Sequence, residues 1–586
     1  MGTETGRSGR DAAHCAPSRG PRCSETGQRR ANGMTGPAGF SLGRAGPLRV
    51  VLIRPRPRGR GFSFGPHTGF TPTSRREARQ ALASASMDGA DTGSGRTLEG
   101  DPVAARLRPS SPVGGLSRRT LAFPQVLAQS VAAVAPSAVM VTLPLLAHPT
   151  AGSLTPVVFL AVAALMVAVA GCVNSFATRM VAPGGLYSYT VKGLGPRAGL
   201  VAGLSLVIGY AGAAAASVLG ATEFLLALLD DLGIDPSGSG TARPLASLAL
   251  AAAAGAVMVR GVRLSAGAVL VVEALAISTV VVVLGVAGWT DLRIDAGLGS
   301  SVPDGHWGLV LLLALVAFVG FESATTLSSE TRRPFSAVPR AVRWTPVVAG
   351  LLFAGAALLV TRDGFVGTSG SGLAWDLSGG GGAGPRLAEA LLHLGVLGSW
   401  FACACGSTTA LTRTLFTMAR EGVLPAPLGR THRRWRTPAL TLVLASGLVG
   451  GSVAATTALG AAPDDVFVWL LSLSAQGYVV AYAFCVVAAP VFLHRIGELP
   501  RAGWLVPALT ATAMAGIVVA GTALDPGRFS RPAVVYLAML ATALVLTLLR
   551  LRARGVRLAT LGLYDETTEA DLLTRRRTAW RGGGRG

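Results

Sequence analysis

Apolar stretches of membrane-spanning length alternate with short polar loops from about residue 120 to about residue 550. A helix needs about 20 apolar residues to cross a bilayer. By that criterion the pattern predicts twelve spans. They are 122–147, 155–176, 197–229, 243–259, 264–289, 307–329, 341–361, 388–417, 438–458, 466–493, 504–523 and 532–549. The third and eighth are long enough to tilt or to project beyond the bilayer.

The charges of the loops test this count independently. If the N-terminus is cytoplasmic, the cytoplasmic loops contain seventeen Arg or Lys residues and the outer loops contain six. Cytoplasmic loops of membrane proteins have such an excess of positive residues. Arg118 and Arg119 before the first span and "RLRARGVR" after the last agree with this orientation. An odd number of spans would scramble the bias, so the charges favour twelve spans with both termini in the cytoplasm.

The composition agrees with a membrane protein. Of 586 residues, 50% are hydrophobic and only 14% are charged, and the mean hydropathy is +0.51. Soluble domains have about 25% charged residues. The net charge is +22, but residues 1–86 hold fifteen Arg and four Asp or Glu, so 15 − 4 = +11 lies there. Because no domain-sized basic face remains, nucleic acid is not a predicted partner.

Residues 1–86 are rich in Arg, Gly, Ser and Pro and show no hydrophobic period, which is the composition of disorder. Two interpretations stay open: a disordered cytoplasmic arm, or a natural start at Met87. The predicted organisation is a disordered arm over 1–118, a twelve-helix membrane domain over 119–552 and a cytoplasmic tail over 553–586.

The first span contains "VAAVAPSAVMV", with Pro136 near its midpoint. Proline removes a backbone donor and clashes with the preceding turn, so it kinks or breaks a helix. If a second half-helix begins at Pro136, the amides of Ser137 and Ala138 are unpaired and face the membrane interior. Free amides at a helix N-terminus form a binding site for a carboxylate. The alternative is a simple proline kink, which is tolerated in transmembrane helices.

The sixth span reads "LVAFVGFESATTLSSE" and places Gly320 two residues before an ionisable Glu322. Gly weakens a helix by about 1 kcal/mol relative to Ala, and an acid at bilayer depth costs about 2.5–3.5 kcal/mol or more. A break at Gly320 leaves preceding carbonyls without helical partners, and these suit an ammonium group. The broken spans are the first and the sixth, which are an odd number of positions apart in the order of spans, so the two segments run in opposite directions, as in an inverted five-plus-five repeat. A zwitterion fits between them.

These motifs resemble those of the amino acid–polyamine–organocation permeases. "FVGFESATTLSSETRRPFSAVPRAV" is similar to their sixth span and the loop after it, and "QSVAAVAPSAVMV" to their first span. "APGGLYSYTVKGLGPRAG" resembles their loop between the second and third spans, and "RGVRLSA" resembles their turn between the fourth and fifth spans. "ALTRTLFTMAREGVLPAPLGRTHRRWRTP" is similar to the end of their eighth span and the loop after it, and the motifs follow one another in the right order. The resemblance implies an all-α fold of the LeuT-like kind, with ten core spans in two inverted repeats and two peripheral spans. It also implies alternating access around a site at the membrane midplane.

The resemblance also implies the substrate-binding residues. They are Ala135, Pro136, Ser137 and Ala138 in the first span and Phe318, Val319, Gly320, Phe321 and Glu322 in the sixth. Relatives often have a Gly-Ser/Ala-Gly break where this chain has Pro136-Ser137. Because this chain lacks Gly there, a substrate can approach its backbone less closely.

Glu322 is the predicted proton-coupling residue, because a partly buried carboxyl group can load and release a proton. The alternative is an ionised Glu322 that is paired with a donor and holds the inner half-helix. Ser407 and Tyr210 are further candidates to line the site, although helix packing and interhelical hydrogen bonding explain them equally. The fifth span has no Lys where some proton-coupled relatives carry one, and its Glu273 is predicted to be a structural partner.

The predicted function is secondary active transport of amino acids, by proton-coupled symport into the cell across the plasma membrane. The alternatives are exchange of amino acids, amines or polyamines, and a non-transporting amino acid sensor. An enzyme is not predicted, because it needs several polar groups at one depth, whereas His148, His306 and His393 lie near the ends of spans. The expected partners are a small substrate and the lipid bilayer. No cofactor or metal is expected, sodium stays an alternative coupling ion, and no pattern indicates an oligomeric state.

Overall fold

The computed structural model describes residue 111 and residues 114–234, 240–287, 293–296, 306–360, 366–367, 375–378, 383–524, 530–556, 558–562 and 564–565. All of them belong to one compact unit, Asp101–Gly586. Most of the predicted N-terminal arm, including Met87, therefore lies outside the described residues.

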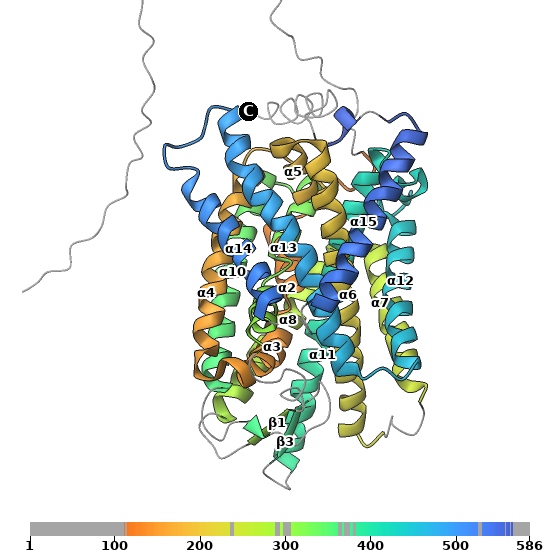
Figure 1. Cartoon of the computed structure of the whole chain (residues 1–586). Coiled ribbons are helices and arrows are strands. Elements are labelled where there is room, and N and C mark those ends of the chain that lie inside the picture. Colours follow the sequence, from red (N-terminus) through yellow and green to blue (C-terminus); the bar gives the residue numbers. More distant parts are fainter. Residues whose placement is uncertain are drawn as a thin grey trace, which may run out of the picture. The chain divides into compact units, whose positions relative to one another are not determined.

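The described chain is helical apart from one small sheet, and Figure 1 shows how its elements are arranged. The elements are α2 (Phe123–Val134), α3 (Pro136–Ala151), η1 (Gly152–Leu154), α4 (Thr155–Ala177), α5 (Leu186–Leu194), α6 (Pro196–Asp231), α7 (Ala242–Arg260), α8 (Val262–Ala287), β1 (Arg293–Ala296), α9 (Trp307–Val316), η3 (Phe321–Glu330), α10 (Pro334–Val360), β2 (Val366–Gly367), β3 (Trp375–Ser378), α11 (Ala383–Arg420), η4 (Ala426–Gly429), α12 (Ala439–Ala458), α13 (Pro463–Arg495), α14 (Leu505–Leu524), α15 (Ser530–Ala553) and η5 (Leu558–Thr560).

Ten helical stretches of the described chain are long and apolar enough to cross a membrane, judged by length and composition alone. The first of them, Phe123–Ala177, has 55 residues and contains both the first and the second predicted span. The eleventh predicted span corresponds to a shorter apolar helix, Leu505–Gly521. The chain is therefore a multi-pass membrane protein, and the count of twelve stays a prediction.

The described residues also contain three short strands that the sequence pattern did not predict. β1 pairs with β2 in parallel and with β3 in antiparallel orientation. Each strand has at most four residues, too short for a readable alternation of polar and apolar positions. Figure 1 shows β1 and β3 at the end of the helical bundle opposite to α5.

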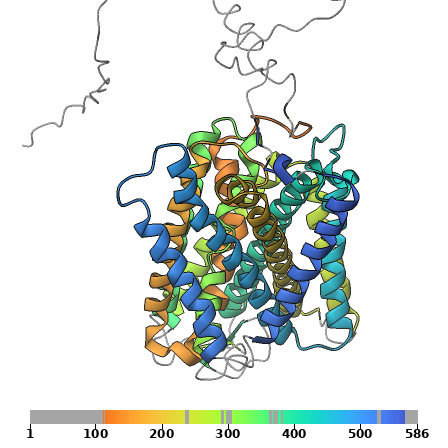
Figure 2. The same cartoon turned by 45° about the horizontal axis from the view of Figure 1, so that its top comes forward.

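Helices at the two edges of the bundle expose apolar side chains, as lipid-facing helices do. Figure 1 shows α4 and α14 on one side and α12 and α15 on the other, and Figure 2 shows the same groups in a turned view. Leu509 on α14 is 62% exposed and Leu448 on α12 is 73% exposed. By contrast, every residue of η3 is buried, together with almost all of α9. The sixth predicted span therefore lies in the core of the bundle.

Residues that precede the helical bundle in the sequence pack together with residues that follow it. The guanidinium of Arg118 lies 2.9 Å from a carboxylate oxygen of Asp565, and the amide of Asp565 donates to the carbonyl of Val181 at 2.7 Å. Leu121 forms an isolated bridge with Thr331. The described part of the predicted tail is therefore bound to the helical bundle, and the described end of the predicted arm is bound to that tail.

Candidate functional site

The first predicted break is confirmed at Ala135. Helix α2 ends at Val134, Ala135 takes a left-handed conformation with φ 50° and ψ 60°, and α3 begins at Pro136. A left-handed conformation costs a residue other than Gly about 1–2 kcal/mol. Pro136 suits the first position of a helix, because an amide there has no helical partner to lose. The first span is therefore two half-helices joined by one strained residue.

The second predicted break is confirmed at Gly320. Helix α9 ends at Val316, and the amides of Phe318 and Val319 make tight turns to carbonyls three residues earlier, at 3.1 and 3.2 Å. Gly320 then has φ 97°, a conformation that favours Gly, and the chain continues as the 3-10 helix η3. The inner half of this span is therefore wound more tightly than an α-helix.

The two breaks touch each other. A Cβ atom added to Gly320 would lie 2.7 Å from both the carbonyl oxygen and the Cβ of Ala133, in the last turn of α2. The Ser130 hydroxyl donates to the carbonyl of Phe321 at 2.5 Å, and the Ser323 hydroxyl donates to the carbonyl of Gln129 at 3.2 Å. The segments before Ala135 and after Gly320 therefore form one hydrogen-bonded unit.

The amides at the start of α3 are paired, contrary to the sequence-based prediction. The amide and the hydroxyl of Ser137 donate to Glu273 Oε1 on α8 at 3.0 and 2.9 Å. The amide of Ala138 donates to the Ser399 hydroxyl on α11 at 3.2 Å, and that hydroxyl donates to Glu273 Oε1 at 3.0 Å. The prediction failed because the capping carboxylate comes from a segment far away in the sequence.

Glu273 is 1% exposed, and its second oxygen, Oε2, has no hydrogen-bond partner among the described residues. A carboxylate at a helix N-terminus is stabilised by the helix dipole and by the amides that it accepts from. These hydrogen bonds agree with the sequence-based interpretation of Glu273 as a structural partner. The sequence did not predict that one of its oxygens has no donor among the described residues.

Glu322 lies at the second break and is fully buried. Tyr210 on α6 donates to Glu322 Oε1 at 2.9 Å, and Tyr482 on α13 donates to Oε2. The amide of Gly320 lies 3.2 Å from the same Oε2. Three donors from three segments therefore converge on one carboxyl group, which turns toward protein and away from lipid.

All eleven candidate residues from the sequence are buried. Phe318 turns toward α10, where its ring packs edge-on against Phe353 at 5.1 Å between centroids. Phe321 packs against Tyr482 at 5.6 Å. The Ser407 hydroxyl lies 3.8 Å from the Cys403 sulfur, one turn earlier on α11.

Cys403 in turn connects α11 to the first break, because its thiol donates to the carbonyl of Ala133 at 3.3 Å. The structure therefore brings Tyr210, Gly320, Phe321 and Glu322 together, and it brings Ser137 and Ala138 together with Glu273. Phe318 lies apart from both groups.

Sequence reasoning missed Ser130, Ser399 and Tyr482 as members of the site. Tyr482 follows Tyr478 by four residues, a spacing that places both rings on one face of α13. That pair of buried aromatic hydroxyls was the available signal. Single Ser residues within apolar helices offered none, because they are common at helix contacts.

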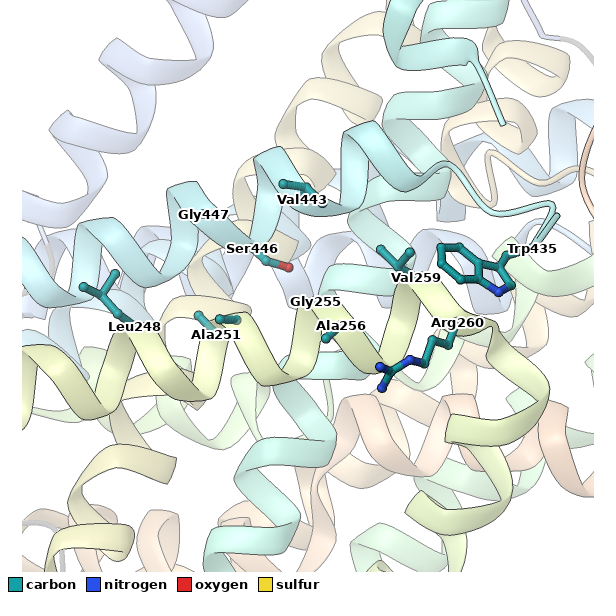
Figure 3. A pocket seen from close by; sticks show the side chains of 11 residues that line it. Leu248, Ala251, Gly255, Ala256, Val259, Arg260, Trp435, Val443, Ser446 and Gly447 are labelled. Carbon is teal, nitrogen blue, oxygen red and sulfur yellow. The ribbon is translucent and has the colours of Figure 1, made fainter. Parts of the chain in front are cut away.

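A large groove lies away from the breaks, between α7 and α12. Its volume is about 630 Å³, and its lining is apolar except for Arg260, Ser446 and the ring nitrogen of Trp435 (Figure 3). None of its lining residues belongs to either helix break, and none is among the hydrogen-bond partners of Glu273 or Glu322 within the described residues. The groove is therefore separate from the candidate substrate site.

Comparison with known proteins gives a consistent result. Residues 121–547 match a family model described as amino acid permease. An uncharacterized transporter of Mycobacterium tuberculosis (strain ATCC 25618 / H37Rv) is 29% identical over 348 residues, which cover 56% of this chain and 71% of that protein. The low-affinity putrescine importer of Escherichia coli (strain K12) is 25% identical over 347 residues, 56% of this chain and 74% of the importer. A branched-chain amino acid permease of Bacillus subtilis (strain 168) is 23% identical over 361 residues, 56% of this chain and 71% of the permease.

Proposed function

Because the chain belongs to the amino acid permease family, we propose that it is a secondary active transporter that moves amino acids or related amines by alternating access. The observation that supports this most directly is the contact between the two helix breaks at Ala133 and Gly320. Broken helices that meet within a membrane bundle supply backbone groups and helix ends for a small charged solute. Helices that serve only as anchors need no such interruption.

The proposed architecture has twelve spans, with the LeuT-like inverted repeat in the first ten. It is supported by the matching positions of the breaks, one in the first and one in the sixth predicted span. In each span a single residue with positive φ, Ala135 or Gly320, separates the two halves. The excess of positive charge in one set of loops supports cytoplasmic termini, and the proposed location is the plasma membrane.

Within this architecture the two half-spans on the inner side of the breaks, α2 and η3, are joined to each other. The segment that ends in α2 is tied to η3 through Ser130 and Phe321. The η3 segment is tied to α11 through Glu330 and Arg413, whose Nε donates to Glu330 Oε1 at 2.8 Å. The bond between Ser130 and Phe321 lets α2 and η3 move as one body, which is what rocking between inward-facing and outward-facing states requires.

We place proton coupling at Glu322. Its carboxyl group sits at the break, so a change in its charge alters the hydrogen bonds from Tyr210, Tyr482 and the Gly320 amide at once. Those donors connect α6, α13 and the sixth predicted span. Gain or loss of one proton would therefore change how three segments are held together.

The test is uptake of labelled amino acids and amines by proteoliposomes at several external pH values, with an imposed pH gradient. Replacing Glu322 by Gln removes the titrating group but keeps its size. We expect the pH dependence of uptake to flatten in Glu322→Gln, while substrate still binds. The matched control is Glu498→Gln at an exposed ion pair with Arg179. Unchanged pH dependence in Glu322→Gln would remove Glu322 from the mechanism.

Exchange of amines is the second candidate. The similarity to a putrescine importer favours an amine as the substrate, and the choice between exchange and symport is left to the experiment. Preloading the proteoliposomes with unlabelled substrate separates the two modes. Symport predicts uptake that needs no internal substrate, whereas exchange predicts uptake that rises several-fold after preloading. Replacing the proton gradient by a sodium gradient tests the alternative ion.

A further inference from the structure

The start of α3 is the position where a permease of this architecture can bind a substrate carboxylate, and here a protein carboxylate fills it. Pro136 has no N–H, and the amide of Ser137 donates to Glu273. The amide of Ala138 donates to Ser399, and the amide of Val139 donates back to the carbonyl of Ala135 at 3.0 Å. The first turn of α3 thus has no amide left for a second carboxylate.

The charges near the breaks also disfavour a substrate carboxylate at the start of α3. A substrate carboxylate at this position would meet the carboxylate of Glu273, and two like charges in a buried site repel each other strongly. The broken helices α2, α3, α9 and η3 contain no Lys or Arg, and their one His, His148, lies at the far end of α3. The acids at the two breaks are Glu273 and Glu322, both buried. Such surroundings favour a cation.

The two acids are linked through a short series of contacts. Glu273 accepts from Ser399 on α11, and Cys403, one turn further along α11, donates to the carbonyl of Ala133. Ala133 touches Gly320, whose amide lies against Glu322. Within the part of the chain that the structure describes, no donor reaches Oε2 of Glu273, so this oxygen is an available acceptor at one end of the series. Ammonium groups are donors without acceptor capacity, so they match an unpaired carboxylate oxygen.

We propose that Glu273 takes the place of the substrate carboxylate, so that the transported substrate is an organic amine without a carboxylate, and most favourably a diamine. The inference rests on the proposed transport function and names the substrate class of that site. An ammonium group binds Glu273 Oε2 near the first break. In a diamine, the second ammonium group lies toward Glu322.

The test uses two pairs of compounds that differ only by a carboxylate: 1,5-diaminopentane with lysine, and 3-methylbutylamine with leucine. Proteoliposomes that contain the full chain are assayed for uptake and for mutual inhibition. We expect the amine of each pair to inhibit at a concentration about tenfold lower than its amino acid, because a charge-assisted hydrogen bond is gained and like-charge repulsion is avoided. A preference for the amino acid in both pairs would overturn the inference.

Glu273→Gln keeps the size of the side chain and an oxygen that can accept from Ser137, but removes its charge. We expect the ratio of amine to amino acid affinity to fall by about tenfold, the inverse of the same charge-assisted contribution. The control is Glu223→Gln, which removes the charge of another buried acid that is paired with Arg243 at 2.6 Å. The control tests general destabilisation, which lowers uptake but leaves this ratio unchanged. An unchanged ratio in Glu273→Gln would contradict a role in substrate selection.

Thermal unfolding of the purified protein in detergent distinguishes failure of this inference from failure of the transport proposal. Stabilisation by the two amines without any uptake would overturn transport and support the binding inference. Uptake of amino acids with no stabilisation by the amines would support transport and overturn the inference. Neither uptake nor stabilisation by any of the four compounds would overturn both.

Discussion

Tyr210 on α6 donates a hydrogen bond of 2.9 Å to Glu322, although the two residues are 112 positions apart in the sequence. Tyr482 donates to the other oxygen of the same carboxyl group. Tyr478 lies between them, with ring centroids 5.3 Å from Tyr210 and 5.7 Å from Tyr482. Its hydroxyl has no hydrogen-bond partner among the described residues. Tyr478 is therefore a matched control for Tyr210 and Tyr482, because it lies in the same cluster but does not bind Glu322.

Replacing Tyr210 or Tyr482 by Phe removes one donor from Glu322 and should alter the pH profile of uptake. A hydrogen bond to a charged group contributes about 1.5–3 kcal/mol, so each variant should lose about tenfold or more in uptake at its pH optimum. Tyr478→Phe removes a hydroxyl from the same cluster without removing a bond to Glu322 and should change uptake little. Equal losses in all three variants would show that the hydroxyls act only by packing.

Gly320→Ala should abolish uptake. The added Cβ would lie 2.7 Å from backbone and side-chain atoms of Ala133, and a positive φ is unfavourable for Ala by about 1–2 kcal/mol. The two breaks would have to separate. Gly355→Ala on α10 is the control, because nothing lies within 4 Å of the added atom and Ala favours a helix over Gly by about 1 kcal/mol. Labelled-substrate uptake and thermal unfolding in detergent measure both effects, and normal uptake by Gly320→Ala would contradict the proposed contact.

Arg413→Ala should destabilise the protein strongly. Arg413 and Glu330 are 1% and 3% exposed, and their closest atoms are 2.8 Å apart. Loss of one partner from a buried ion pair leaves the other charge uncompensated and costs about 3–5 kcal/mol. The double variant Arg413→Ala/Glu330→Ala should recover part of that loss.

Arg179→Ala provides the comparison for this pair. Arg179 binds Glu498 at 2.6 Å, but the side chains are 34% and 55% exposed. Exposed pairs contribute about 0–1 kcal/mol, so its unfolding temperature in detergent should change little. Equal shifts for Arg179→Ala and Arg413→Ala would contradict the importance of burial.

Cysteines introduced at the two ends of α12 should react with an impermeant maleimide from opposite sides of the membrane. Arg433 is exposed just before α12, and Leu459, directly after it, is 86% exposed. We expect Arg433→Cys to be labelled only in inside-out vesicles and Leu459→Cys only in intact cells. The four cysteines of the described chain are buried, and Cys15→Ser/Cys23→Ser removes the other two. Labelling in the reverse order would invert the proposed topology.

The sequence indicated where the helices break because those signals are local. Proline at 136 cannot donate to the preceding turn, and Gly320 is the residue best suited to a positive φ. Both effects depend on one residue and its neighbours in the chain. The same reasoning singled out Glu322, which the structure shows to be buried, because an ionisable group within an apolar stretch is costly where it meets lipid.

The identity of the groups that meet at the breaks depended on packing. Ser137 and Glu273 are 136 residues apart, and no local pattern predicts that α8 presents a carboxylate to the start of α3. The sequence-based prediction left the amides of Ser137 and Ala138 free for substrate, whereas the fold supplies them with a carboxylate and a hydroxyl. The family resemblance did not correct this error, because it concerned the residues of the broken spans themselves.

By itself, the sequence determined that the chain is a multi-pass helical protein interrupted near Pro136 and Gly320, since hydrophobic length and backbone preference are properties of contiguous residues. Only the tertiary structure decided that the interruptions touch, that Tyr210 and Tyr482 bind Glu322, and that Glu273 occupies the helix N-terminus. These contacts depend on the orientation of each helix about its own axis and on how the helices pack. That packing brings together side chains that are far apart in the sequence.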